Sequence, residues 1–408
     1  MDFEPMYKVY YKRPQDWQCL LDQRRRSESS IQLPIGIHEY NRRNTYSAFF
    51  MYHPELIDLL LRIESKRYEF MQYVEQIPTI IIGHLMNAFL STEIKASNDI
   101  EGVRSSHREI QEAIDNTHNS KLRFSSIITK YKMIVQHNEL LTYKNSAEIR
   151  QLYDEVISSE IKKRDLPDGT LFRKDSVDVV NHQQKVIHQG TTPESEIIKE
   201  MNKALDILND ESIQLPIRVA IFHYYFGYIH PFYDGNGRTN RFISTVYLAH
   251  HFHPLIALRL SAVIKNSKKN YYDAFKYTNS EFNGGDVTTF IIPFIRIIES
   301  TINDAIRLLD KRIVRLQGYS KKLEKYFEIN QIHDPLLQSI YFLLLQANLF
   351  SLGAGINKQE IMSACDKSRG TIYNRFKKIP DSHIIKIKRG RVESYTLKLS
   401  MLDSINRL

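Results

Sequence analysis

The feature that most constrains the fold is the stretch 230–241, which reads His-Pro-Phe-Tyr-Asp-Gly-Asn-Gly-Arg-Thr-Asn-Arg. Before it, apolar residues recur at helical spacing from 217 to 228, and Pro216 suits a first helical turn. After it, a second helical pattern begins at Phe242. The sequence therefore predicts two helices joined by a loop in which the polar and glycine residues are concentrated.

The residue types in this loop suit the handling of phosphate groups. His230 can accept a proton near neutral pH, and Asp234 is a hard oxygen ligand of the kind that Mg²⁺ prefers. Gly235 and Gly237 allow the backbone to turn tightly and to approach an anion. Asn236 adds a neutral hydrogen-bond donor.

The helix that we expect from about Arg238 would direct its unpaired N–H groups at the same loop. Arg238 and Arg241 are three residues apart, so both would lie on one face of this helix and reach phosphate oxygens. Together the loop predicts phosphoryl or nucleotidyl transfer from a nucleoside triphosphate. The alternative is an ordinary helix turn with a packed histidine and a charged surface.

The stretch resembles the Fic domain signature, His-Pro-Phe-x-(Asp/Glu)-Gly-Asn-Gly-Arg-x-x-Arg, at every specified position. The resemblance implies a mainly α fold, a Fic-type helical bundle with a small β-hairpin flap, that transfers AMP from ATP to a hydroxyl side chain. It also implies a role for each loop residue: His230 as the base, Asp234 as the Mg²⁺ ligand, Gly235, Asn236, Gly237 and Arg238 at the α- and β-phosphates, and Arg241 at the γ-phosphate. Doc-type kinases of the superfamily have lysine at the position of Gly237 and lack Gly235, which argues against kinase chemistry.

A second motif lies upstream, at Ser97-Asn98-Asp99-Ile100-Glu101-Gly102. It resembles the Fic inhibitory motif, (Ser/Thr)-x-x-x-Glu-(Gly/Asn), whose glutamate pairs with the second arginine of the signature, here Arg241. A carboxylate at that position would take the place of the γ-phosphate and repel the triphosphate. The resemblance thus implies autoinhibition by Glu101, with Ser97 as part of the motif. The alternative is a capped helix end with a solvated glutamate.

Two further features of the resemblance are weaker in the sequence. Residues 171–180, followed by Val186 and Ile187, alternate in part and predict a β-hairpin, which would be either the flap that aligns a target segment as an added strand or a plain surface hairpin. In Fic proteins a tyrosine and an asparagine contact the nucleoside, and Tyr272 and Asn279 are the candidates. Core packing is an equal explanation for a tyrosine in a chain with 24 of them.

Length and composition are those of a soluble globular protein of two or three domains. The chain has 408 residues, of which 42% are hydrophobic and 25% charged. We expect no membrane-spanning segment and no secretory signal, because the apolar runs are short or interrupted and no basic region precedes one. Cys19 and Cys365 fit no metal spacing, which favours a cytoplasmic protein.

The net charge of +9 is concentrated near the C-terminus, since residues 356–400 hold eleven Lys and Arg against four acids. This region predicts three helices, over 335–349, 357–364 and 368–378, and two strands around Arg389-Gly390. The pattern resembles a winged helix-turn-helix, an α+β domain, and implies that Arg369, Asn374, Arg375 and Arg389 contact DNA. The alternative is a winged helix used for protein contact or dimerisation.

We therefore divide the chain into an N-terminal helical region with the inhibitory helix (1–120), a Fic core (121–310), a helical connector (311–332) and a winged-helix domain (333–408). The first 50 residues are expected to be irregular. The predicted function is an ATP- and Mg²⁺-dependent protein adenylyltransferase that modifies a tyrosine, serine or threonine of a target protein or of itself. The alternative is a DNA-binding regulator in which the core is a nucleotide-sensing or self-modifying switch. The predicted partners are ATP, a protein with an exposed hydroxyl, DNA and a second copy of the chain, with no membrane.

Overall fold

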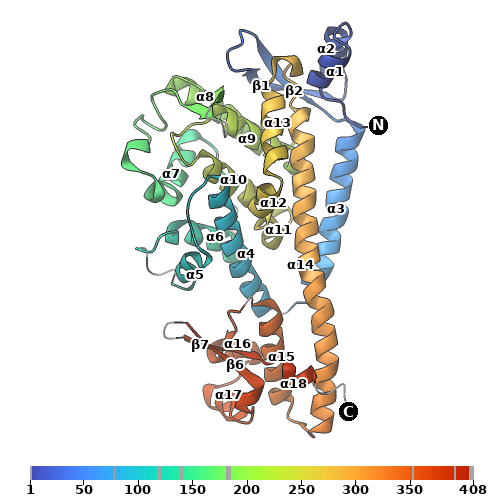
Figure 1. Cartoon of the computed structure of the whole chain (residues 1–408), viewed down its shortest axis with the longest axis vertical. Coiled ribbons are helices and arrows are strands. Elements are labelled where there is room, and N and C mark those ends of the chain that lie inside the picture. Colours follow the sequence, from blue (N-terminus) through green and yellow to red (C-terminus); the bar gives the residue numbers. More distant parts are fainter. Residues whose placement is uncertain are drawn as a thin grey trace. The chain divides into compact units, whose positions relative to one another are not determined.

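The computed structural model describes residues 2–77, 79–116, 119, 121–137, 141–180, 185–351, 353–389 and 392–403 (Figure 1). The chain forms two compact units. One comprises Met1–Arg67 and Leu90–Asn303, and the other Tyr68–Phe89 and Asp304–Leu408. The boundaries fall within three long helices, α3 (Pro54–Val74), α4 (Thr79–Ile100) and α14 (Thr288–Ile329). In the described part of the chain, no helix combines the length and the apolar character needed to cross a membrane.

The first 50 residues are ordered into regular elements, so the prediction of an irregular segment is wrong. They form α1 (Met6–Lys12), α2 (Trp17–Arg26) and an antiparallel hairpin of β1 (Ser30–His38) and β2 (Thr45–Met51). Aromatic contacts with a distant segment hold the short helices, because Tyr7 stacks on Tyr277 and Tyr10 on Phe282 at ring-centroid distances of 4.3 and 3.8 Å. Local sequence carries no trace of such contacts.

The helical bundle of the first unit surrounds α9, the helix before the signature loop. Twelve of the fifteen residues of α9 are buried, because its sequence is apolar on all sides. Helices α8 and α10 pack against it. The helices of this bundle are α5 (His107–Asp115), α6 (Ser125–His137), α7 (Ser146–Val156), α8 (Glu194–Asn209), α9 (Leu215–Ile229), α10 (Asn236–His251), α11 (Pro254–Ala257), α12 (Leu260–Asn266) and α13 (Lys268–Asn279).

The predicted hairpin is present but shorter than expected. It consists of β3 (Asp178–Val180) and β4 (Val186–Gln189), which pair antiparallel. Residues 171–177 are not a strand because the Glu194 carboxylate accepts the backbone N–H groups of Leu171 and Phe172, at 2.7 and 2.9 Å. The side chain thereby takes up donors that a strand would direct at its neighbour.

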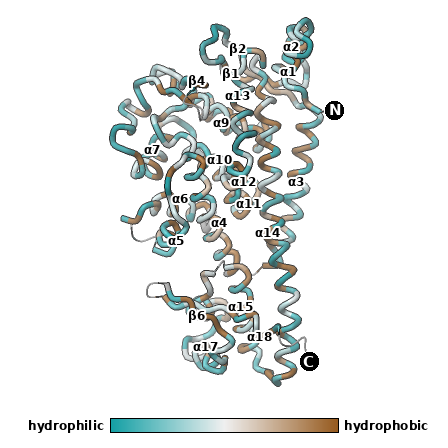
Figure 2. The backbone as a smooth tube through the Cα atoms, in the orientation of Figure 1, coloured by the Kyte–Doolittle hydropathy of each residue, from teal (hydrophilic) through white to brown (hydrophobic). Residues whose placement is uncertain are grey.

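Helix α14 covers most of the predicted connector, 311–332, and ends at Ile329. It continues from Thr288 to Ile329 with Pro293 in its second turn, where proline supplies no N–H for the carbonyl four residues earlier. Figure 2 shows hydrophobic and hydrophilic residues alternating along this helix, as expected for one that covers a core on one side.

The C-terminal part of the second unit contains the three helices and the hairpin that the sequence predicted. They are α15 (Pro335–Phe350), α16 (Lys358–Cys365), α17 (Arg369–Phe376), β6 (Ile384–Arg389) and β7 (Val392–Leu397), followed by α18 (Ser400–Asp403). A two-residue strand that was not predicted, β5 (Ile356–Asn357), pairs with β7 and gives a sheet of order β5-β7-β6. Asn357 then starts α16 with a capping box to Glu360, as its sequence favours.

Candidate active site at the loop between α9 and α10

The loop of residues 230–235 is held in place by the ends of the two helices that it joins. His230 ends α9 in the left-handed conformation, with φ 53° and ψ 61°, and its N–H donates to the Phe226 carbonyl at 3.0 Å. At the other end, Gly235 precedes α10 with φ +85°. Helix α10 begins at Asn236, two residues earlier than predicted.

Asn236 braces the loop instead of presenting its whole amide to a ligand. Its Nδ2 donates to the Phe232 carbonyl at 2.7 Å, and its Oδ1 accepts the Phe232 N–H at 2.9 Å. One amide hydrogen and the oxygen are therefore engaged within the loop. Asn236 was predicted to donate to a phosphate. Only its second amide hydrogen and its backbone N–H remain for that role.

The imidazole of His230 is placed to act as a base. Its Nδ1 lies 3.3 Å from the Gly227 carbonyl, so a proton on Nδ1 leaves the lone pair on Nε2 available. Burial lowers the pKa of His230 to about 4; the Gly227 carbonyl and Glu101 act against this shift, and Arg173 adds to it. The ring is therefore neutral at pH 7, the state in which a histidine can take a proton.

A fully buried arginine, Arg173, fixes the backbone behind this histidine. Its guanidinium donates to the carbonyls of His230 at 2.9 Å, Thr191 at 2.8 Å and Asp175 at 2.7 Å. Burial lowers the pKa of Arg173 to about 10. Sequence reasoning missed this residue, which lay inside the predicted hairpin without a signal of its own.

The hairpin lies against the loop at its last residues, which favours the flap over a plain surface hairpin. His188 on β4 is buried and its Nε2 is 2.6 Å from the Tyr228 carbonyl of α9. At Gly190 a Cβ atom would lie 3.1 Å from Cβ of His230 and 2.3 Å from Nη2 of Arg173. Only a glycine permits this approach, so β4 leads directly to the candidate base.

Asp234 is the exposed carboxylate of the loop. Its side chain is 51% exposed, its Oδ1 accepts the Gly235 N–H at 2.5 Å, and the same oxygen lies 3.7 Å from Nη2 of Arg238. Among the described residues there is no cluster of three or more metal-ligating side chains. One accessible carboxylate fits Mg²⁺ in its usual association with nucleotides, where phosphates and water supply the other ligands.

The first signature arginine, Arg238, is buried beside a carboxylate that the sequence did not single out. Arg238 is 3% exposed, and its Nη1 lies 3.4 Å from Glu160 Oε2. Burial raises the pKa of Glu160, although Arg238 and Arg123 act in the opposite direction. The Nε of Arg238 has no hydrogen-bond partner among the described residues, so one of its donors is unsatisfied.

The second arginine, Arg241, makes the pairing that the upstream motif predicted. It is 1% exposed, and its Nη1 donates to Glu101 Oε1 at 2.7 Å. Its Nε donates to Ser97 Oγ and its Nη2 to the Ser97 carbonyl, both at 3.0 Å. Burial by itself would raise the pKa of Glu101, but Arg241 lowers it below the usual range, so the carboxylate is charged at neutral pH.

Glycine at 237 gives the Glu101 carboxylate room beside the loop. A Cβ atom there would lie 2.1 Å from Glu101 Oε1 and 2.9 Å from Nη1 of Arg241. Any side chain at this position would collide with the ion pair. Gly237 was predicted to allow an anion to approach the backbone closely. In the structure the anion at this position is the protein's own Glu101 carboxylate.

The two candidate nucleoside residues lie on α13 in different surroundings. Tyr272 is 38% exposed, and burial first and Glu101 second raise its pKa to about 12. Asn279 is 9% exposed, and its Oδ1 accepts the Tyr224 hydroxyl at 2.6 Å. Tyr272 can therefore face a ligand near the Glu101–Arg241 pair, whereas the oxygen of Asn279 is already engaged.

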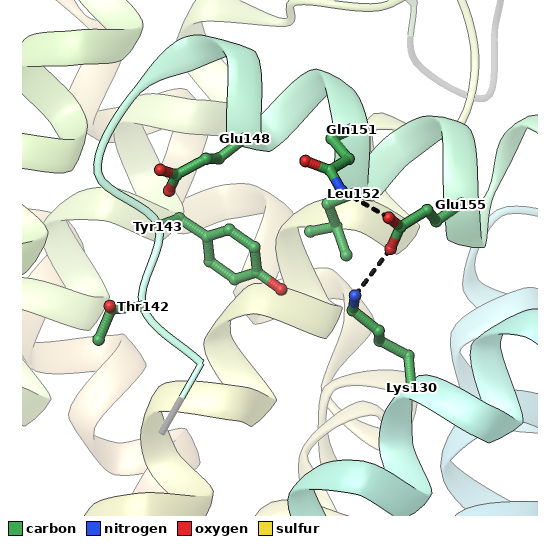
Figure 3. Close-up of a pocket in the computed structure, with 7 residues that line it drawn as sticks. All are labelled: Lys130, Thr142, Tyr143, Glu148, Gln151, Leu152 and Glu155. Carbon is green, nitrogen blue, oxygen red and sulfur yellow. Dashed lines mark hydrogen bonds and ion pairs between the residues drawn. The ribbon is translucent and has the colours of Figure 1, made fainter. Parts of the chain in front are cut away.

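A pocket of about 130 Å³ lies elsewhere in the same unit, on α6, α7 and the residues before α7 (Figure 3). Lys130 and Glu155 form an ion pair of 2.7 Å at this pocket. None of the predicted site residues lines it. Its lining residues are Lys130, Thr142, Tyr143, Glu148, Gln151, Leu152 and Glu155.

The predicted DNA-contacting residues lie in the second unit and differ in exposure and in pairing. Arg369 and Asn374 are exposed on α17. Arg375 donates from Nε to Asp334 Oδ2 at 3.1 Å, so its charge is already paired. The side chain of Arg389 lies outside the described residues.

Residues 141–248 match the model of the Fic/DOC family, a segment that contains the whole loop and α9. The chain is 32% identical over 221 residues to "Protein adenylyltransferase Fic" of Nematostella vectensis, and 27% identical over 179 residues to "Protein adenylyltransferase fic-1" of Caenorhabditis elegans. These alignments cover 50% and 41% of this chain, and 46% and 33% of the relatives. The chain thus spans half or less of the length of the curated relatives it matches.

A solved structure supports the fold. The Fic family protein from Desulfovibrio desulfuricans G20 aligns with a TM-score of 0.50 at 19% identity, over 86% of this chain and 97% of that one. With the family match, this supports a mainly helical Fic domain around the loop.

Proposed function

We propose that this protein transfers AMP from ATP to a hydroxyl side chain of a target protein or of itself. The observation that carries the proposal is the position of His230, whose Nδ1 faces the Gly227 carbonyl, in a loop that ends at the start of α10. The unpaired N–H groups of a helix start suit an anion, and Arg238 and Arg241 lie on the same helix. The relatives that carry the name protein adenylyltransferase support it.

In the proposed reaction the target hydroxyl attacks the α-phosphorus of ATP. A new oxygen–phosphorus bond forms, the bond to the β-phosphate oxygen breaks, and diphosphate leaves. His230 takes the hydroxyl proton on Nε2, since its Nδ1 faces the Gly227 carbonyl. The N–H groups at the start of α10 and the guanidinium groups stabilise the charge that gathers on the phosphate oxygens.

Mg²⁺ bound to the triphosphate would be held through Asp234, the accessible carboxylate of the loop. It would supply charge neutralisation at the phosphates. The protein itself supplies the remaining functions. Arg238 binds phosphate, and the target segment pairs with the flap as an added strand, which positions its hydroxyl.

The pair of Glu101 and Arg241 is proposed as an internal restraint. While Glu101 holds Arg241 at 2.7 Å, this guanidinium cannot pair with a γ-phosphate, and the carboxylate repels the triphosphate. ATP in a transfer-competent pose therefore requires the carboxylate to move.

The test is transfer of label from ATP to protein by the Glu101→Gly variant. Label at the α-phosphate should appear on protein, and label at the γ-phosphate should not. The wild type should be slower, and His230→Ala in the Glu101→Gly background should give no transfer. Protein labelled from the γ-position would indicate a kinase and overturn the proposal.

A second candidate function is a DNA-binding regulator, favoured by the exposed basic side chains of the second unit. Arg369, Lys377 and Lys378 are exposed near the third helix of the C-terminal module, and Lys388 is exposed on β6. A gel-shift titration with DNA from its own promoter region tests this. Binding that weakens steeply with salt supports it, and no shift at low salt removes it.

A further inference from the structure

The helix that carries the inhibitory motif meets α10 along a continuous polar seam. The seam residues are Glu93 and Ser97 on α4 together with Glu101, the residue directly after α4, and Gly237, Arg241 and Thr245 on α10. In each row the residues are four apart and so lie on one face. Thr245 donates to Glu93 at 3.4 Å, Arg241 binds Ser97 and Glu101, and Glu101 fits over Gly237. The two rows run in opposite directions, and the inhibitory motif supplies only one end of the seam.

Glu93 forms the other end and is fully buried. Its Oε2 accepts the Ser261 N–H at 2.9 Å, and its Oε1 accepts the Ser261 hydroxyl at 2.5 Å in addition to Thr245. The carboxylate therefore ties α4 to two other helices, α10 and α12, through three accepted hydrogen bonds. Burial raises the pKa of Glu93, and the Ser261 donors together with Arg241 and Arg259 act in the opposite direction.

A buried carboxylate at this point has no role in the proposed chemistry. An apolar side chain of similar size would pack α4 against α10 at less cost in desolvation. What an apolar residue would not do is fix the position of α4 along its axis, because apolar contacts tolerate a shift, whereas directional hydrogen bonds to Ser261 and Thr245 do not. Glu93 lies two turns before Glu101, so its anchor determines where the inhibitory carboxylate arrives.

We propose that Glu93 is a positioning residue of the restraint. It anchors α4 to Ser261 and Thr245, and this register brings Ser97 and Glu101 onto Arg241. The test by AMP transfer rests on the proposed function, whereas the test by hydrogen exchange does not. It extends the inhibitory element from the six-residue motif to the whole seam, with Glu93 acting through Glu101 and not on the nucleotide.

The activity test is a double-mutant cycle with α-labelled ATP. Glu93→Ala should raise transfer by about tenfold or more over the wild type, because the restraint loses its anchor. Glu93→Ala combined with Glu101→Gly should be no faster than Glu101→Gly alone. Glu93→Gln, which keeps one acceptor oxygen, should fall between wild type and Glu93→Ala. Glu112→Ala, an exposed glutamate on α5, is the matched control and should equal the wild type.

The cycle can overturn the proposal in two ways. Glu93→Ala that is folded but as slow as the wild type would remove it, and so would an equal rise from Glu93→Ala in the presence and absence of Glu101. If Glu93→Ala has lost its cooperative melting transition, the same comparisons apply to Glu93→Gln.

Hydrogen exchange supplies a readout that needs no catalysis. Backbone amides of residues 97–101 should exchange at least about tenfold faster in Glu93→Ala than in Glu112→Ala, while those of α9 stay unchanged. Unchanged protection of 97–101 would overturn the positioning role. If Glu101→Gly transfers no label at all, the proposed function fails, and exchange alone then decides the role of Glu93.

Discussion

The arginines of α10 and Arg369 of α17 carry the same charge in opposite surroundings. Arg238 and Arg241 are nearly inaccessible and lie against Glu160 and Glu101. On α17, Arg369 is exposed, and its guanidinium lies 5.2 Å from the centre of the Tyr373 ring. The first pair is occupied by carboxylates of the same chain, whereas Arg369 faces solvent.

The difference teaches what each region requires of a ligand. An anion that binds at α10 must displace a carboxylate from a buried guanidinium, so occupancy is coupled to a movement of α4 and is only weakly screened by salt. An anion that binds at α17 needs to displace only water and counterions, so binding there is immediate and strongly salt-dependent. Buried charge suits a controlled site, and exposed charge suits a docking surface.

The largest effect is expected at the base beside the buried arginines. His230→Asn in the Glu101→Gly background should lower AMP transfer on the order of 10²–10⁴-fold, because no group remains to take the hydroxyl proton. Asparagine tolerates the left-handed backbone of this position, so the fold should be kept. His251→Asn, at the far end of α10, is the control. Retained transfer in His230→Asn would exclude the histidine as the base.

The next effect concerns the displacement that the α10 site requires. Glu101→Gln should tighten ATP binding by about 10–100-fold in calorimetry, because the competing charge is removed without loss of volume. The gain should change little between low and high salt. Asp99→Asn, which lies between Ser97 and Glu101 on another face of α4 and pairs with Lys95 and Lys265, should leave the affinity unchanged. Equal affinities of the wild type and Glu101→Gln would contradict the restraint.

A smaller effect separates the exposed from the paired arginine of α17. Arg369→Ala should weaken DNA binding several-fold and reduce the salt slope by about 1, as for the loss of one phosphate contact. Arg375→Ala should have less effect on affinity, because Asp334 already holds this guanidinium. Titrations at three salt concentrations measure both. A larger loss from Arg375→Ala than from Arg369→Ala would show that the ion pair opens on binding.

The smallest expected effect is the response of the base to acid. A histidine is a base only when neutral, and burial lowers the pKa of His230 from 6.5 to about 4. Transfer by Glu101→Gly should therefore stay nearly constant from pH 8 to about pH 5 and fall only as the pH approaches 4. Single-turnover rates across this range test it. A half-maximal rate near pH 6.5 would show that the ring is solvated as an ordinary histidine.

The elements around the site were predictable because their signals are local. The apolar spacing before and after the loop predicted α9 and α10, and the order of residue types predicted the loop between them. The contact between Glu101 and Arg241 was predicted from two motifs that lie 140 residues apart. In the C-terminal module, the helices and the hairpin followed the same periodicities.

What could not be predicted depends on partners that are distant in the sequence. Arg173 binds a carbonyl 57 residues away, Arg238 meets Glu160 across 78 residues, and Glu93 binds Ser261 across 168. Arg173, Glu160 and Glu93 stand in no motif, and each looks like an ordinary surface charge until the fold buries it. The N-terminal helices were missed for the same reason, since aromatic contacts with 277–282 hold them.

The missing side chain at position 237 has a lasting consequence for how this protein could change over time. The void beside that α-carbon admits the inhibitory carboxylate, and it borders the turn that would cradle the nucleotide, so the two occupants share one gap. A mutation there cannot weaken one without harming the other. If Glu101 restrains transfer as proposed, changes in the strength of this restraint are expected at α4 and its anchors, which lie outside the loop of residues 230–235.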